Sequence, residues 1–131
     1  MVAMTRAMKE QAFTHIVQVT MAKEDGDPLA LALAQRRVND VFSLISLTSE
    51  QIDGLQYQEG DATVMLDPGR MNMIKIFKNY IRHRRIIDNN PVGNSLADYV
   101  AITQDLFDEF RMSEYGDVNT SIYNTPVPRL T

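Results

Sequence analysis

Two short stretches of this sequence place acidic side chains at matching positions. Residues 47–55 read LTSEQIDGL and residues 102–110 read ITQDLFDEF, so in each a threonine precedes one acid by two residues and an aspartate by five. Paired carboxylates can serve as general acid and base. A threonine ahead of apolar residues at helical spacing is also a helix N-cap, and acids in the first turn suit the helix dipole. We therefore interpret both stretches as helix starts and expect no catalysis from them.

Basic side chains concentrate between residues 70 and 85, where six basic residues occur without an acid although the chain has a net charge of -4. At helical spacing four of these residues share a face beside an apolar one: Lys75, Lys78, Arg82 and Arg85. Such a face can bind nucleic-acid phosphates by counterion release, or an acidic protein surface. The simpler alternative is a solvated face that is balanced by acids elsewhere in the chain.

Arg84 differs from the other basic residues of this segment, because the same spacing puts it on the apolar side near Tyr80 and Phe77. Close to a helix end, an arginine can extend into solvent or bond the last carbonyls. The alternative is a buried or interface arginine that pairs with Asp105 or Asp108.

Residues that bind metals or act as nucleophiles are sparse. The chain has no cysteine, and neither of its two histidines, His15 and His83, has a partner at metal-ligand spacing. Nucleophile-elbow and phosphate-loop motifs are also missing. We expect no metal, no cofactor and no enzymatic activity, and we place both histidines on the surface.

The elements that carry these residues are predicted to be helical. Asp27-Pro28 and Asp67-Pro68 each combine an N-cap with a proline at the first helical position. We predict an all-α fold, a compact bundle of about six mostly short helices with one long amphipathic helix over about 68–87. Gln58–Asp61 reads as a turn and Thr63–Leu66 as an extended segment.

Helical periodicity ends at Arg111, so we divide the chain into a helical domain, 1–111, and an extended C-terminal arm, 112–131. Arm residues expected to make contacts are Tyr115, Ile122 and Tyr123. No stretch approaches the ~20 apolar residues of a membrane span, and no signal peptide is recognisable at the N-terminus. We therefore expect an intracellular protein, cytoplasmic or nuclear, that does not enter a membrane.

Five segments in this order carry a family resemblance: PLALAL, VNDVFSLISLTSEQIDGLQY, IKIFKNYIRHRR, NPVGNSLADYVAITQDLFDEFR and SIYNTPVP. Across about residues 12–128 the chain resembles the Gag-like helical domain that precedes the protease and reverse transcriptase in long-terminal-repeat retrotransposon polyproteins of diatoms and related algae. The resemblance implies a small, non-enzymatic helical module used in assembly or binding, with no catalytic residues to carry over.

These observations favour protein–protein association or assembly, with a protein partner or a homo-oligomer, and a symmetric dimer first among oligomers. The alternative is a nucleic-acid-binding domain that uses the basic face of the 70–85 helix.

Overall fold

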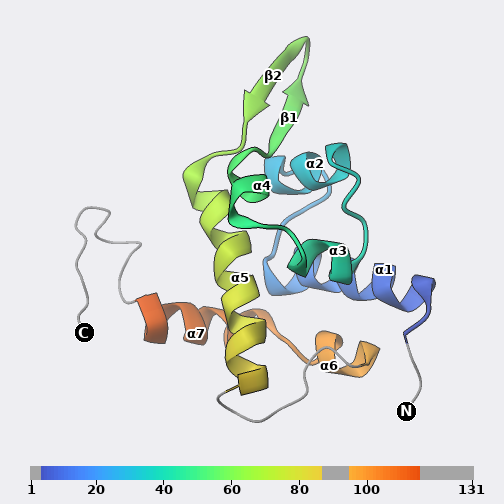
Figure 1. Cartoon of the computed structure of the whole chain (residues 1–131), viewed down its shortest axis with the longest axis vertical. Helices are drawn as coiled ribbons and strands as arrows, with labels where there is room; N and C mark the ends of the chain where they lie inside the picture. Colours follow the sequence, from blue (N-terminus) through green and yellow to red (C-terminus); the bar gives the residue numbers. More distant parts are fainter. Residues whose placement is uncertain (1–3, 87–94, 116–131) are drawn as a thin grey trace.

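The computed structural model describes residues 4–86 and 95–115, and helices make up most of this part of the chain (Figure 1). The elements in chain order are α1 (Arg6–His15), a π-helical turn η1 (Ile16–Thr20), α2 (Pro28–Gln35), α3 (Val41–Ile45), α4 (Ser49–Asp53), β1 (Gln56–Glu59), β2 (Ala62–Met65), α5 (Pro68–Ile86), α6 (Leu96–Val100) and α7 (Gln104–Tyr115).

Helix starts follow the predicted capping residues. Asp27 accepts from the Leu29 N–H at 2.9 Å and caps α2, while Asp67 accepts from the Arg70 N–H at 3.1 Å at the start of α5. Thr48 forms a full capping box with Gln51. Thr103 accepts from the Leu106 N–H at 3.1 Å in the first turn of α7. The twin stretches are therefore helix starts, as their spacing predicts.

The prediction of a purely α-helical fold is wrong at residues 56–65, which form an antiparallel β-hairpin. Gln56 lies opposite Met65, and Glu59 opposite Ala62, across a two-residue turn. Gly60 has φ +64°, while Asp61 is not among the residues with positive φ, which is the pattern of a type II′ turn with glycine first. The segment from Thr63 is indeed extended, but its partner strand QYQE was not anticipated because it is polar.

The core forms around α5, which crosses the middle of the molecule (Figure 1). Ile74, Phe77 and Ile81 of this helix are buried, and Phe77 packs edge-on against Phe107 of α7 with ring centroids 5.8 Å apart. Tyr99 of α6 is fully buried in the same core. The long helix predicted over about 68–87 is confirmed as α5.

The last described helix, α7, runs to Tyr115, four residues beyond the predicted end of the helical pattern at Arg111. No helix breaker occurs before Gly116, so the polar residues after Arg111 continue the helix on its exposed side. The side chain of Tyr115, and both Ile122 and Tyr123, lie outside the described part of the structure. Among the described helices, none is both long and apolar enough to cross a membrane.

Candidate interaction surfaces

Two of the four predicted basic-face residues of α5 make contacts within the protein. Lys75 Nζ forms an ion pair with Asp53 Oδ1 at 2.7 Å, which joins α5 to the last residue of α4. Lys78 Nζ donates to the backbone oxygen of Leu47, just before the Thr48 cap. Both ammonium groups therefore hold α4 against α5, and part of the positive charge of this face is already balanced.

Arg82, in contrast, is exposed on α5 and can be reached by a partner. The side chain of Arg85 lies outside the described part of the structure. Of the predicted basic-face residues, Lys75 and Lys78 thus contact the α4 region. The Arg82 guanidinium remains on the surface.

Arg84 is half-buried and directed onto an aromatic ring. Its Nη1 donates to the Tyr80 hydroxyl at 2.8 Å, and its guanidinium carbon lies 5.7 Å from the centre of the Tyr80 ring. Asp108, one of the two predicted partners, is bonded to Arg111 of its own helix at 3.3 Å. The position on the apolar side of α5 was predictable from helical spacing, whereas the tyrosine contact was not.

Arg70, which was not singled out by sequence reasoning, links two helix starts. Its Nε and Nη2 donate to the two carboxylate oxygens of Asp27 at 2.9 and 3.0 Å, and its Nη1 donates to Asp67 Oδ1 at 2.8 Å. A bidentate guanidinium–carboxylate pair is among the strongest polar contacts. The two Asp-Pro signals in the sequence are thus joined by one arginine.

This arrangement shifts the ionisation of all three groups. Hydrogen bonding from Arg70 lowers the pKa of Asp27 below its ordinary value of 3.8, against an opposing effect of burial. Burial raises the pKa of Asp67, but the bonds from Arg70 outweigh it and the net pKa is lowered. The same bonds raise the pKa of the Arg70 guanidinium. Each charged form is therefore favoured by the folded structure.

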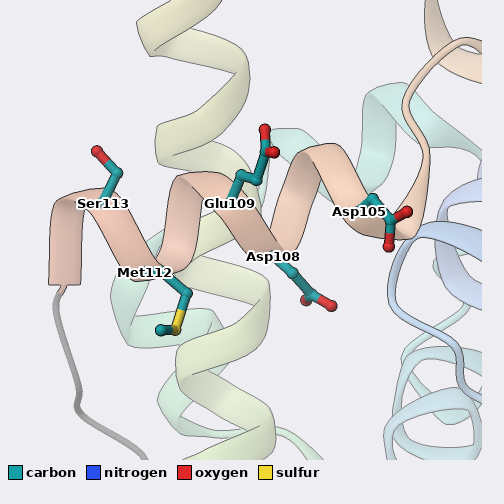
Figure 2. A pocket seen from close by; sticks show the side chains of 5 residues that line it. All are labelled: Asp105, Asp108, Glu109, Met112 and Ser113. Atoms are coloured by element: carbon teal, nitrogen blue, oxygen red, sulfur yellow. The ribbon is translucent and has the colours of Figure 1, made fainter.

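The solvent side of α7 is acidic and carries a shallow, open depression. Figure 2 shows its lining on one helix, with Asp108 and Met112 directed to one side and Glu109 and Ser113 to the other. Asp105 completes the lining near the start of the helix. Within the described residues no group of three or more acids and histidines is arranged to hold a metal ion.

The prediction of two surface histidines is wrong, because His15 and His83 are both half-buried. The Nε2–H of His15 donates to the backbone oxygen of Ile102 at 2.9 Å. Thr20 is 1% exposed and its hydroxyl donates to the same oxygen at 2.7 Å. The His83 ring lies 5.3 Å from that of Phe110. Helical spacing alone did not reveal that the turn at Ile102 packs on His15.

The β-hairpin is a surface feature that sequence reasoning missed. It extends from the helical body, with α2 on the β1 side, and no other described element is drawn beside β2 (Figure 1). Tyr57 and Val64 lie opposite each other and are half-buried, while Gln56, Thr63 and Met65 are exposed. The turn residues Gly60-Asp61 followed by an apolar extended segment were the available signal.

The backbone of the hairpin determines which groups face outward. The Leu66 N–H donates to Leu55 O at 2.9 Å, so Leu55 and Leu66 form a hydrogen-bonded pair. Such pairs alternate along an antiparallel ladder. The pair Tyr57–Val64 is then hydrogen-bonded as well, while the N–H and C=O of Thr63 and Met65 point away from β1. The outer edge of β2 thus offers backbone donors and acceptors to solvent.

Searches of known protein families, of curated proteins and of solved structures find no match to this chain.

Proposed function

We propose that this chain acts in protein–protein association, as an assembly or scaffold module of the kind that its Gag-like resemblance implies. The observation that carries the proposal is the open edge of β2. Backbone groups at a strand edge are a ready template for pairing with another chain, and extended partners are commonly bound in this way.

Exposed apolar side chains lend further support. Met65 on β2 is 53% exposed and Met112 on α7 is 55% exposed. Methionine is flexible and polarisable, and it recurs at surfaces that adapt to partners.

Two experiments on the full chain test the proposal: sedimentation velocity and affinity capture from cell extract. Over about 10 μM to 1 mM we expect the mean sedimentation coefficient to rise with concentration, as a small interface of micromolar to millimolar affinity requires. A monomer at all concentrations, together with the recovery of no partner in the capture, would contradict association as the function.

A second candidate, nucleic-acid binding along α5, is favoured by the exposed guanidinium of Arg82. It receives less support than association, because Lys75 and Lys78 are engaged by Asp53 and by the Leu47 carbonyl. If the face does bind nucleic acid, the logarithm of the affinity should fall linearly with the logarithm of the salt concentration.

Fluorescence anisotropy with a labelled oligonucleotide separates this candidate from non-specific attraction. Arg82→Glu should weaken binding by about tenfold or more if α5 is the contact face, whereas Arg36→Glu, a change at an exposed arginine at the end of α2, should weaken it far less. Equal losses in the two variants, or no binding by the native chain at low salt, would remove the nucleic-acid candidate.

A further inference from the structure

The exposed edge of β2 consists of the sequence ATVM, which carries no charge and no proline. Charged side chains, prolines and bulges are the usual means by which proteins prevent unwanted pairing at an edge. Packing against a helix or a further strand stabilises a two-stranded hairpin, and here α2 supports β1 while no described element lies beside β2. The edge is therefore suited to accept another strand.

We propose that the partner at this edge is a second copy of the same chain, whose β2 pairs antiparallel with the first. This inference rests on the proposed function and specifies its partner. Since the four residues of β2 are uncharged, pairing the strand with itself places no like charges opposite each other within the strand. The strand must run antiparallel to its copy in a two-fold dimer, which is the arrangement that an isologous interface requires.

The backbone geometry limits the register to pairings between outward-facing residues. The register in which the outward N–H and C=O groups of Thr63 and Met65 bond only each other places Thr63 of one copy opposite Met65 of the other, and the two residues exchange both backbone bonds. Val64 lies on the axis, opposite Val64 of the second copy, in a pair without hydrogen bonds. The two hairpins then form one continuous sheet, with β1 of each copy at its outer edges.

This pairing uses the β2 edges of both copies and therefore gives a closed dimer. After two β2 strands have paired, the outer strands of the sheet are the two β1 strands, which lie on the side of α2. Further copies meet a different and more polar edge, QYQE, so the assembly stops at a dimer. Because β2 has only four residues, the interface is small and the dimer is expected to be weak, with a dissociation constant of ~10 μM to 1 mM.

Two matched proline variants test the edge. Thr63→Pro removes an outward N–H of β2, and Gln58→Pro removes the corresponding outward N–H of β1. Both lose the same bond between Gln58 Nε2 and Thr63 Oγ1 (2.8 Å), and neither removes a backbone bond within the hairpin. In sedimentation velocity of the full chain we expect Thr63→Pro to raise the dissociation constant about tenfold or more, because each copy loses a bond, while Gln58→Pro leaves it nearly unchanged.

A charge-exchange experiment tests the pairing of β2 with β2 even if a proline disturbs the hairpin. One variant carries Thr63→Lys and Met65→Lys, and a second carries Thr63→Glu and Met65→Glu. Each variant alone should sediment as a monomer, because like charges face each other, and the equimolar mixture should dimerise because opposite charges then face each other.

The possible outcomes distinguish this inference from the wider proposal. Dimerisation that survives Thr63→Pro and both charge variants would overturn β2 pairing and leave association through another surface. A native chain that stays monomeric to about 1 mM would overturn self-pairing, and a different protein captured through β2 would then be the partner. Dimerisation that is lost in each charge variant and restored in their mixture supports the pairing of β2 with β2.

Discussion

At the scale of single residues, Arg70 makes three side-chain hydrogen bonds to two aspartates. The guanidinium bonds both oxygens of Asp27 and one oxygen of Asp67, so it joins the first residues of α2 to those of α5. These elements are distant in sequence, and the arginine therefore contributes to tertiary structure as well as to capping. The contribution of the Arg70 contacts to stability depends on the flat, forked shape of the guanidinium.

Replacing Arg70 by lysine tests this dependence on shape. Arg70→Lys keeps the charge but cannot bond the Asp27 carboxylate through two parallel N–H groups, so we expect the free energy of unfolding in urea to fall by about 1–2 kcal/mol. Arg6→Ala is the control, because the Arg6 side chain is 89% exposed in its pair with Glu10 and should change stability by less than about 0.5 kcal/mol. Equal losses of unfolding free energy in the two variants would show that the bidentate geometry of Arg70 contributes no more stability than an exposed surface pair does.

The lowered pKa values of Asp27 and Asp67 predict how stability depends on pH. Because each folded pKa lies below the ordinary value of 3.8, the unfolded chain binds more protons at acidic pH, and stability falls as pH drops below about 4 toward the folded values. The variant Asp27→Asn with Asp67→Asn should be less stable at neutral pH and should lose less stability between about pH 5 and pH 3. Urea titrations at each pH measure this, and a slope equal to that of the native chain would contradict it.

At the scale of elements, one backbone carbonyl connects α1 and η1 to the turn that precedes α7. Ile102 O lies in the turn between α6 and α7 and accepts from Thr20 of η1 and from His15 of α1. Thr20 is buried, and its hydroxyl satisfies this carbonyl away from water. The π-helical turn places Thr20 at this position, which a regular helix pattern did not predict.

A double-mutant cycle tests the shared acceptor. Thr20→Val and His15→Phe each remove one donor and should each lower the free energy of unfolding by about 1 kcal/mol, since the other donor still satisfies Ile102 O. The double variant leaves this carbonyl without either donor, so its loss should exceed the sum of the two by about 0.5–1.5 kcal/mol. Strict additivity in urea denaturation would indicate that the two bonds act independently.

The elements differ in how far sequence predicted them. Helix starts at Asp27, Asp67, Thr48 and Thr103 were predictable, because capping depends on residues within one turn of each other. The hairpin was only half recognised, since β1 is polar and only Tyr57 and Val64 turn toward the body. Contacts of Arg70 and His15 were not predictable, because they join elements whose packing no local pattern specifies.

At the scale of the whole molecule, the basic and the aromatic residues of α5 contact different neighbouring helices. Its basic residues partly stabilise the packing of α4, its aromatic residues meet α7, and the hairpin extends away from both. The binding face predicted on α5 was assigned its free charges without knowledge of the contacts that Lys75 makes with Asp53 and Lys78 makes with Leu47. The edge of β2, where no described element lies alongside, is the surface on which the proposed pairing rests.

The central claim, pairing of β2 between two copies, is tested most directly by amide hydrogen exchange measured by NMR at about 20 μM and about 1 mM. The account predicts that the Thr63 and Met65 amides, which point outward in one copy, become several-fold more protected at the higher concentration, while Val64, bonded within its own hairpin, changes much less. Thr63 and Met65 amides that exchange equally fast at both concentrations would contradict it.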